Sequence, residues 1–221
     1  MQAGTRQYDK IDQVTFSPES HLMSSKEDET FSLEALRAGD RAEFARLVET
    51  YYELVYRLAL KMLNDPQDAE DVLQETFFKA LRGIQKFDGR SSLSTWLYRI
   101  ATNEALMALR RRRPDIVSTD EPLENEEGEQ EPLQIVDWCC LPERDLMSAE
   151  AKRYLDEAIA RLSPNLRAVF VLRDIQGLST QETGEVLNLS ETAVKTRLSR
   201  ARLRLREDLS GYFGEKLVKA S

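Results

Sequence analysis

Apolar residues recur at helical spacing in two separate stretches of this 221-residue chain, 40–113 and 148–207, whereas residues 114–147 show no apolar period. Neither stretch alternates apolar and polar residues as a half-buried strand does, and neither has the strand–helix–strand pattern of a parallel sheet. The sequence therefore predicts an all-α fold in which two small helical domains are joined by a flexible acidic linker. Each domain is so short that its own apolar core should be small.

The first stretch predicts three helices. The first begins after Asp40 as N-cap, with Glu43 at the spacing of a capping box. A second begins at Pro66 behind the cap Asp65, and a third spans 93–113. The apolar side of the first helix comprises Phe44, Leu47, Val48, Tyr51, Val55, Leu58, Ala59 and Met62. The apolar sides of the other two comprise Ala69, Val72, Leu73, Thr76, Phe77, Ala80 and Leu81, and Leu93, Trp96, Leu97, Ile100, Ala101 and Ala108.

The second stretch predicts a helix near 148–162, another from Asn165 to about Ile175, and then a short and a long helix separated by the turn "NLS". Ser179 and Ser190 are placed to cap these last two helices. Two helices joined at a steep angle by three or four residues form a helix-turn-helix, which predicts binding to DNA. The final helix would be anchored by Val194, Leu198, Ala201 and Leu205.

These patterns divide the chain into five segments. The N-terminal extension is expected to be disordered, and the acidic run "DEPLENEEGEQE" lies in a stretch too long for an ordinary loop inside one domain. The predicted boundaries are 1–30 for the extension, 31–113 for the first domain, 114–147 for the linker, 148–212 for the helix-turn-helix domain and 213–221 for a C-terminal tail.

The overall charge of −8 conceals opposite local charges. Residues 37–113 and 151–221 carry net charges of +3 and +4, whereas 1–36 and 114–150 carry −4 and −11. The local field decides which partner a surface attracts, so both helical domains are expected to suit a polyanion.

The final helix carries six basic side chains and no acidic one between Thr192 and Arg206. In a helix-turn-helix the N-terminal part of the second helix enters the major groove, where its side chains read base edges. A basic face that merely meets solvent is the plain alternative, but the capped helix, the tight turn and the absence of acids favour DNA. Base contacts are expected from Glu191, Thr192, Lys195, Thr196, Ser199 and Arg200. Phosphate contacts, which set register without reading sequence, are expected from Arg197, Arg202, Arg204 and Arg206.

The outward faces of the first domain indicate two further surfaces. On the helix 66–82, Phe78 projects among carboxylates, which is typical of a protein-docking face but also occurs on ordinary surfaces. Phe87 and the turn "DGRSS" could hold an unstacked base, whereas Trp96 is expected in the core. Residues predicted to face outward on the third helix are Tyr98, Arg99, Thr102, Asn103 and Leu106, followed by Arg110 to Arg113, which also suit a helix C-terminus.

The residue inventory argues against enzymatic or metal chemistry. The single histidine, His21, lies in a polar tail, the two cysteines Cys139 and Cys140 are adjacent, and no Gly-rich phosphate loop is present. We therefore expect no catalytic residues, cofactor or metal. No apolar run approaches the roughly 20 residues that cross a bilayer, and no signal peptide is seen, so a cytoplasmic protein without membrane insertion is expected.

Three motifs in this order carry a resemblance to a known family: "DAEDVLQETFFKAL", "KFDGRSSLSTWLYRIATNEALMALRRRR" and "LSETAVKTRLSRARLRLRE". With them, residues 33–113 and 148–210 resemble the bacterial extracytoplasmic-function (ECF) sigma factors of RNA polymerase, in the sigma-70 family. The resemblance implies a region 2-like helical bundle, a region 4-like helix-turn-helix, and a role in promoter recognition. It also implies the partners: core RNA polymerase through its largest-subunit clamp helices and flap region, promoter DNA, and an anti-sigma factor.

The resemblance further implies roles for particular residues. The second domain would read the −35 element with residues 191–200, and the acidic linker would run through polymerase channels. Docking on the clamp helices would involve Asp71, Gln74, Glu75 and Phe78. Capture of the separated −10 strand would involve Lys86, Phe87, Asp88, Arg90, Ser91, Ser92, Arg99, Asn103, Arg110 and Arg111.

Two positions depart from the family's usual pattern. Gly184 stands where the family often has Ala, at a cost of about 1 kcal/mol in helix propensity, and Asn188 stands at a frequent turn Gly. Two other functions remain as alternatives. A helix-turn-helix repressor or activator without polymerase would leave the first domain unexplained, and an enzyme acting on nucleic acid would need motifs that the chain lacks.

Overall fold

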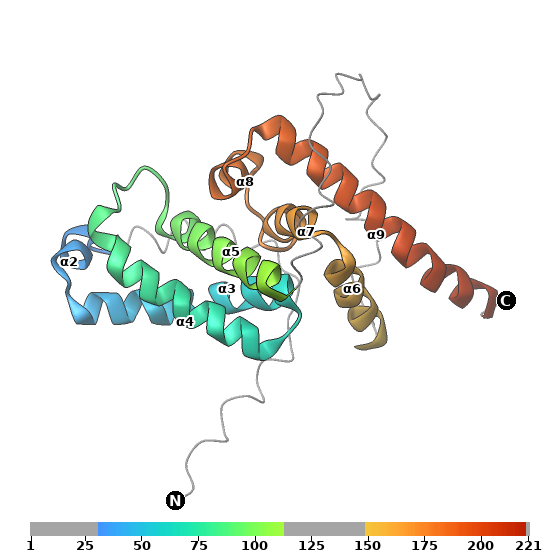
Figure 1. The fold of residues 1–221 in the computed structure, drawn as a ribbon, viewed down its shortest axis with the longest axis horizontal. Helices are drawn as coiled ribbons and strands as arrows, with labels where there is room; N and C mark the ends of the chain where they lie inside the picture. The colour runs from blue at the N-terminus through green and yellow to red at the C-terminus, as the bar shows by residue number, and fades with distance from the viewer. Residues whose placement is uncertain (1–30, 113–148, 220–221) are drawn as a thin grey trace, which may run out of the picture.

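The structure is a computed structural model that describes residues 31–112 and 149–219, and within these ranges it contains helices and no strand (Figure 1). The all-α prediction is confirmed. The N-terminal domain comprises α2 (Leu33–Ala38), α3 (Arg41–Leu63), α4 (Pro66–Gly83), the 3₁₀ turn η2 (Ile84–Lys86) and α5 (Leu93–Arg112). The C-terminal domain comprises α6 (Ala149–Arg161), α7 (Pro164–Phe170), the π-helical turn η5 (Val171–Ile175), α8 (Thr180–Leu187) and α9 (Glu191–Lys219).

The structure differs from the expected elements at several places. Apolar spacing did not identify α2, and α9 continues beyond residue 212, where the domain was expected to end. The predicted linker and N-terminal extension, together with His21, Cys139 and Cys140, lie outside the described residues.

Polar caps set the starts of the first helices. The Asp40 carboxylate accepts the backbone N–H groups of Ala42 and Glu43 at 2.8 and 3.1 Å, as predicted. The predicted capping box is wrong, however, because the Glu43 carboxylate accepts the backbone N–H of Ser32 at 2.8 Å instead of returning to Asp40. Ser32 is itself the N-cap of α2, so Glu43 ties the beginning of α2 to α3.

Helices α3, α4 and α5 pack against one another through the apolar sides that the sequence predicts. Tyr51, Leu58 and Leu97 are buried at the centre of this packing. One predicted core residue is an exception: Leu81 of α4 is 49% exposed and lies with the outward-facing residues of that helix. It follows Ala80, which is fully buried, so the stripe ends one residue earlier than apolar spacing alone suggests.

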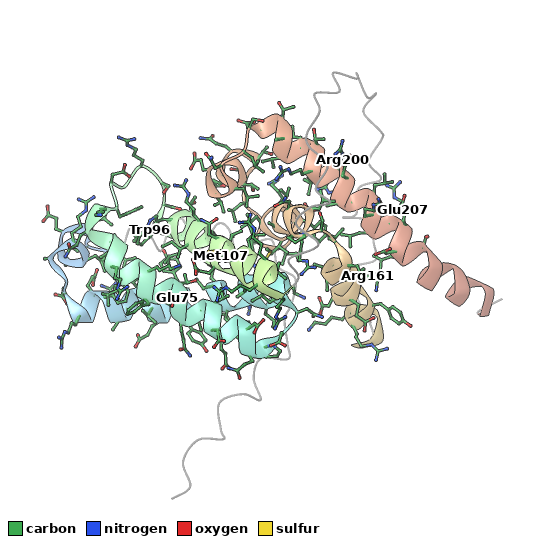
Figure 2. The ribbon with its side chains drawn as sticks, in the orientation of Figure 1. Glu75, Trp96, Met107, Arg161, Arg200 and Glu207 are labelled. Carbon is green, nitrogen blue, oxygen red and sulfur yellow. The ribbon has the colours of Figure 1, made fainter. Side chains whose placement is uncertain are left out.

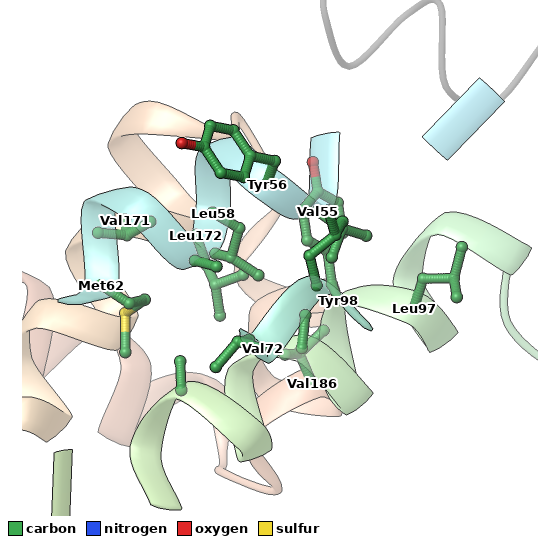
Figure 3. Packing of buried hydrophobic residues seen from close by; sticks show 14 of the residues in the cluster. Val55, Tyr56, Leu58, Met62, Val72, Leu97, Tyr98, Val171, Leu172 and Val186 are labelled. Carbon is green, nitrogen blue, oxygen red and sulfur yellow. The ribbon is translucent and has the colours of Figure 1, made fainter. Parts of the chain in front are cut away.

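The two domains pack directly against each other, so that one apolar cluster extends across both (Figure 3). Leu58 and Met62 of α3 belong to the same buried cluster as Val171 and Leu172 of η5. Val186 of α8 joins it from the helix-turn-helix. A small separate cluster of Val169, Val194 and Leu198 lies within the C-terminal domain, as expected for a short domain, and the rest of the apolar core is shared.

A buried arginine joins the helix ends of the two domains. The Arg167 guanidinium of α7 donates to the backbone carbonyls of Ala160 and, at 3.0 Å, Leu162, near the end of α6, and to that of Met62 at 2.5 Å near the end of α3. The last carbonyls of a helix have no partner within the helix, and a cation also suits the negative end of the helix dipole. One side chain thus caps a helix of each domain.

Three further polar contacts cross between the domains. The Tyr98 hydroxyl of α5 lies 3.1 Å from Oε1 of Gln176 in a buried position. Nη2 of Arg99 donates to the backbone carbonyl of Glu185 in α8 at 2.7 Å. Lys61 of α3 forms an ion pair with Asp156 of α6. We call this set of packed residues, with the shared apolar cluster and Arg167, the interdomain contact.

Candidate nucleic-acid interface

The helix-turn-helix is built as the sequence predicts. Ser179 and Glu182 form a complete capping box at the start of α8, with bonds of 3.1 and 2.7 Å. Asn188 ends α8 in the left-handed conformation, at a φ of 55°, which asparagine tolerates better than most residues. The hydroxyl of Ser190 then accepts the backbone N–H of Ala193 and caps α9.

Gly184 has a structural reason in this turn. A Cβ at this position would lie 2.7 Å from the carbonyl oxygen of Leu189, and the backbone N–H of Leu189 donates to the Gly184 carbonyl at 2.9 Å. The two backbone segments are therefore too close for an alanine. The close turn explains the glycine that helix propensity alone disfavours.

The N-terminal part of α9 presents one continuous polar face. Val194, Leu198 and Ala201 hold the opposite side of the helix in the domain, as predicted. Figure 2 shows Arg200 on the outer side of α9. All six predicted base-reading residues are exposed on the first three turns: Glu191, Thr192, Lys195, Thr196, Ser199 and Arg200.

The four predicted phosphate-binding arginines differ in their surroundings. Arg206 is exposed, and Arg204 lies 3.6 Å from the Glu207 carboxylate. Arg202 donates through Nε and Nη2 to both oxygens of the Asp174 carboxylate at 2.8 Å each, so its guanidinium is held against η5. Arg197 is half-buried. Arg204 and Arg206 are thus the more accessible cations of this set.

The predicted strand-capture loop, residues 86–92, begins at the last residue of η2. Its residues Lys86, Asp88 and Arg90 are exposed, whereas the Phe87 ring is buried against Trp96 with ring centroids 5.0 Å apart. Gly89 has a φ of 78°, the left-handed conformation that lets the loop reverse before α5. Ser92 accepts the backbone N–H of Thr95 at 3.0 Å and so helps to start α5.

A cavity of about 310 Å³ opens beside this loop. Figure 2 shows Trp96 near the start of α5, where the loop enters the helix. Trp96 is half-buried, between the core position and the exposed base platform considered from the sequence. The cavity is lined by Lys79, Gly83, Lys86, Phe87, Trp96, Ile100, Asn103 and Glu104.

Five lining residues were not among the predicted site residues: Trp96 and Ile100 were expected in the core, and Lys79, Gly83 and Glu104 were given no role. Lys79 of α4 and Glu104 of α5 form an ion pair of 2.5 Å in the wall of the cavity. Gly83 lies close to the Trp96 ring, because a Cβ placed on Gly83 would be 3.3 Å from the nearest ring atom. Lys79 and Glu104 are 25 residues apart on different helices, so apolar periodicity gives no signal that they meet. Only the packing of α4 on α5 brings them together.

The outward face predicted for α5 is partly covered by the C-terminal domain. Asn103 and Arg99 are exposed as expected, although Arg99 is engaged with Glu185. Tyr98 is 5% exposed and Thr102 is fully buried, so their predicted outward position is wrong. Burial in the interdomain contact, with the Glu182 carboxylate as a further cause, raises the pKa of the Tyr98 hydroxyl above its usual value.

The arginines that end α5 fall into two groups. Arg110 and Arg111 are exposed, as their predicted contact with DNA requires. Arg112 instead forms ion pairs with Asp65 and Asp68 at the start of α4. The backbone N–H of Asp68, with Arg112 nearby, holds the pKa of the Asp65 carboxyl below its usual value. Arg112 therefore stabilises the packing of α5 on α4.

The outer face of α4 bears the residues predicted to bind polymerase. Asp71, Gln74 and Glu75 are exposed, and Figure 2 shows Glu75 on this face. Phe78 is 46% exposed and lies under the Arg82 guanidinium, 4.0 Å from its ring centroid. With Leu81 also exposed, the face holds two large apolar side chains next to carboxylates. Such a combination is typical of a protein-binding surface.

The described residues contain neither a candidate metal site nor a membrane-spanning helix. Residues 31–112 and 149–219 contain no group of three His, Cys, Asp or Glu side chains that could hold a metal ion. No helix in the same ranges is long and apolar enough to span a membrane.

Each of the two helical domains contains a match to a known protein family. Residues 47–114 match Sigma-70 region 2, and residues 152–205 match Sigma-70, region 4. The ECF RNA polymerase sigma factor SigW of Bacillus subtilis is 38% identical over 177 residues, which cover 80% of this chain and 94% of SigW. The RNA polymerase sigma-H factor of Pseudomonas aeruginosa is 35% identical over 183 residues, which cover 81% of this chain and 93% of that protein.

Two solved structures have a similar fold. One is CnrH in complex with the cytosolic domain of CnrY, with a TM-score of 0.59 and 24% identity, covering 88% of this chain and 99% of that chain. The other is the sigma factor RpoE in complex with the anti-sigma factor NepR from Bartonella quintana, with a TM-score of 0.56 and 24% identity, covering 76% of this chain and 97% of that chain. Together with the matched regions and the sequence identity to SigW, the geometry leads to one conclusion: the chain belongs to the ECF sigma factors of RNA polymerase.

Proposed function

We propose that three surfaces of this sigma factor divide the work of promoter recognition. The exposed face of α9 reads the −35 element, the loop 86–92 with its cavity captures the separated −10 strand, and the outer face of α4 docks on the polymerase clamp helices. The cavity is the observation that carries this assignment. It lies directly beside the loop that the sequence singles out for strand capture.

The cavity has the properties that an unstacked base requires. Its volume of about 310 Å³ lies at the lower end of the range for small-molecule sites. Phe87 and Trp96 supply aromatic surface, and Lys86 and Asn103 are exposed at its edge. Stacking on an aromatic side chain contributes about 1–3 kcal/mol per base. The cation and the amide can then hold the phosphate and the base edge.

The energy of strand capture shows why the polymerase is needed. DNA stacking averages about 1.4 kcal/mol per base-pair step, so opening some ten base pairs costs roughly 14 kcal/mol. One or two captured bases return about 1–3 kcal/mol each. The deficit is met by a large enzyme bound to the same DNA, which makes the α4 face as necessary as the cavity.

We infer that the domains separate when the promoter is bound. The −10 and −35 elements lie about 25 base pairs apart, or roughly 85 Å along B-form DNA. In the structure the two domains instead share one apolar cluster, and the interdomain contact engages Tyr98 and Arg99 on the strand-binding side of α5. Residues 113–148 can span at most about 120 Å, which permits the separation.

The remaining roles follow from family membership and similarity of fold. We propose that an anti-sigma factor binds this chain, because the solved relative RpoE is bound to one. We also propose that the chain acts in the cytoplasm, where core polymerase and promoter DNA are found, and that the polymerase performs the chemistry.

Run-off transcription with purified core polymerase tests the proposed function. The wild-type chain should direct transcripts from a specific start site. Phe78→Ala should weaken association with the core enzyme, whereas Asn103→Ala and Lys195→Ala should lower transcription and leave that association intact. Arg57→Ala, at an exposed position of α3, is the control and should behave as wild type.

The outcomes separate the sigma-factor function from its alternatives. Repression without association with polymerase would support a helix-turn-helix repressor, and strand cleavage would support an enzyme. If Phe78→Ala and Asn103→Ala gave the same defect in association, the assignment of separate surfaces would be wrong.

A further inference from the structure

Helix α2 connects the strand-capture loop to the rest of the N-terminal domain, although it lies outside the residues that match Sigma-70 region 2. Leu36 is 1% exposed in the core, and the Phe31 ring lies 5.8 Å from that of Tyr51. The bond from the Ser32 backbone N–H to Glu43 holds the start of the helix. This short helix is thus firmly attached to α3.

The last turn of α2 reaches the loop through one side chain. Nε and Nη2 of Arg37 both donate to the backbone carbonyl of Phe87, at 3.0 and 2.6 Å. Leu33, one turn earlier, packs near the loop tip, since its Cδ1 lies 3.6 Å from an ideal Cβ at Gly89. A guanidinium presents its donors in a rigid fork, so two bonds to one oxygen restrict where that carbonyl can lie.

The carbonyl that Arg37 holds belongs to the residue whose ring forms a wall of the cavity. Phe87 ends η2, where its backbone N–H bonds to the Ile84 carbonyl at 3.1 Å. Its ring is 6% exposed and contacts Trp96. The backbone of Phe87 is therefore fixed from both sides, by η2 through its N–H and by α2 through its carbonyl.

We propose that Arg37 is a positioning residue for strand capture. By holding the Phe87 carbonyl, Arg37 keeps the Phe87 ring against Trp96, so that the cavity is already shaped before a base enters. Arg37 acts through Phe87 and not by touching the strand. This inference rests on the proposed role of the cavity in strand capture.

Trp96 provides a direct optical readout of the cavity. The chain has two tryptophans, Trp96 and Trp138, so Trp138→Phe leaves Trp96 as the only one. Lys86 and Asn103 at the edge of the cavity are exposed in the structure, so the cavity is accessible while the two domains are in contact. Trp96 emission is then followed during titration with oligo(dA), oligo(dC) or oligo(dT). Strands of about ten nucleotides are used, a length within the range that single-strand sites cover.

Two substitutions in the Trp138→Phe chain test Arg37. Arg37→Met keeps the apolar stem and removes the donors, and it should weaken strand binding about 10-fold and change the Trp96 emission of the free protein. Arg37→Lys keeps the charge but offers a point donor in place of a fork, so its loss should be smaller. Arg41→Ala is the matched control, since it removes one charge from an exposed arginine four residues away and should change the affinity less than twofold.

Each outcome decides the inference. If Arg37→Met bound the strands like Arg41→Ala, with unchanged Trp96 emission, Arg37 would not be a positioning residue. If the parent chain, which carries Trp138→Phe alone, showed no change in Trp96 emission with any of the three strands, the proposed role of the cavity in strand capture would be refuted. The inference about Arg37, which rests on that role, would then be refuted as well. Thermal unfolding followed by circular dichroism checks that each variant is folded, and association with core polymerase should be unchanged in all of them.

Discussion

The hydroxyl of Tyr98 should control how often the two domains separate. Tyr98 and Gln176 are 5% and 8% exposed, and their side chains lie 3.1 Å apart across the interdomain contact. Tyr98→Phe removes the hydroxyl and leaves the Gln176 amide oxygen buried without this donor. Leaving a buried polar group unsatisfied costs about 1–3 kcal/mol. When the domains are apart, water forms hydrogen bonds to the Gln176 amide. The cost therefore falls only on the closed arrangement, in which the interdomain contact is formed.

A cost of about 2 kcal/mol corresponds to roughly a 30-fold shift from the closed toward the open arrangement. The shift can be measured by chemical labelling at Thr102, which is fully buried one helical turn beyond Tyr98 on the same face of α5. The background carries Cys139→Ser, Cys140→Ser and Thr102→Cys, so that the introduced thiol is the only one. Because Tyr98 on the same helix face contacts Gln176 of the C-terminal domain, we expect this thiol to react with a reagent only while the domains are apart. Tyr98→Phe should then raise its rate of labelling roughly 30-fold.

A second substitution separates the hydrogen bond from any other effect of Tyr98. Replacing both partners of a buried hydrogen bond by apolar groups of similar shape can be nearly neutral. Tyr98→Phe combined with Gln176→Met should therefore label almost as slowly as the parent. Tyr52→Phe removes a hydroxyl from an exposed tyrosine of α3 and serves as control. An unchanged rate in Tyr98→Phe, or a double variant as fast as the single one, would refute the reasoning.

Two further predictions concern Gly184 in the helix-turn-helix and the pH dependence of the interdomain contact. Gly184→Ala gains about 1 kcal/mol in helix propensity, but its Cβ would lie 2.7 Å from the Leu189 carbonyl oxygen. Overpacking against backbone costs about 1–3 kcal/mol, so chemical denaturation should show that Gly184→Ala lowers the free energy of unfolding. The control is the opposite change, Ala45→Gly, at an exposed position of α3, which should cost only the helix propensity of about 1 kcal/mol. Burial raises the pKa of Tyr98, so its neutral form stabilises the closed arrangement fully below the ordinary pKa of about 10 and loses this effect as the pH rises further. Labelling of the introduced thiol should therefore become faster above about pH 10, and Tyr98→Phe should remove that dependence. Gly184→Ala that raised stability would contradict the first prediction, and a labelling rate that did not change with pH would contradict the second.

Helix positions and the exposed face of α9 could be predicted because each depends on residues close in sequence. Caps such as Asp40, Asp65 and Ser179 lie within three residues of the N–H groups that they satisfy. The stripe Val194, Leu198 and Ala201 fixes by itself which side of α9 faces outward. These features follow from the period of one helix, so a single sequence is enough to locate them.

Features that need two distant segments could not be predicted. The ion pair between Lys79 and Glu104 depends on the packing of two helices, and the bonds from Arg37 to Phe87 join residues 50 positions apart. Gly184 was interpreted from propensity as a cost, whereas its reason is the approach of the Leu189 carbonyl. In each case the local pattern is compatible with several partners, and only the tertiary arrangement selects one.

The proposed function gives the outward face of α5 two partners, DNA and the C-terminal domain. The sequence places Tyr98 and Thr102 on the outward side of α5, but both are buried in the structure, and Tyr98 contacts Gln176 of the C-terminal domain. Periodicity identifies the side of a helix that is not used by its own domain, but not what covers it. Under the proposed function this face receives DNA in one state and the C-terminal domain in another, and a strongly apolar face would hold the domains together permanently. Polar groups can bind either partner, because each can exchange its hydrogen-bond partner for water or phosphate. The groups on this face are the Tyr98 hydroxyl, the Arg99 guanidinium that reaches a backbone carbonyl, and small polar residues. The same residues that made this face resemble a nucleic-acid surface therefore keep the interdomain contact reversible.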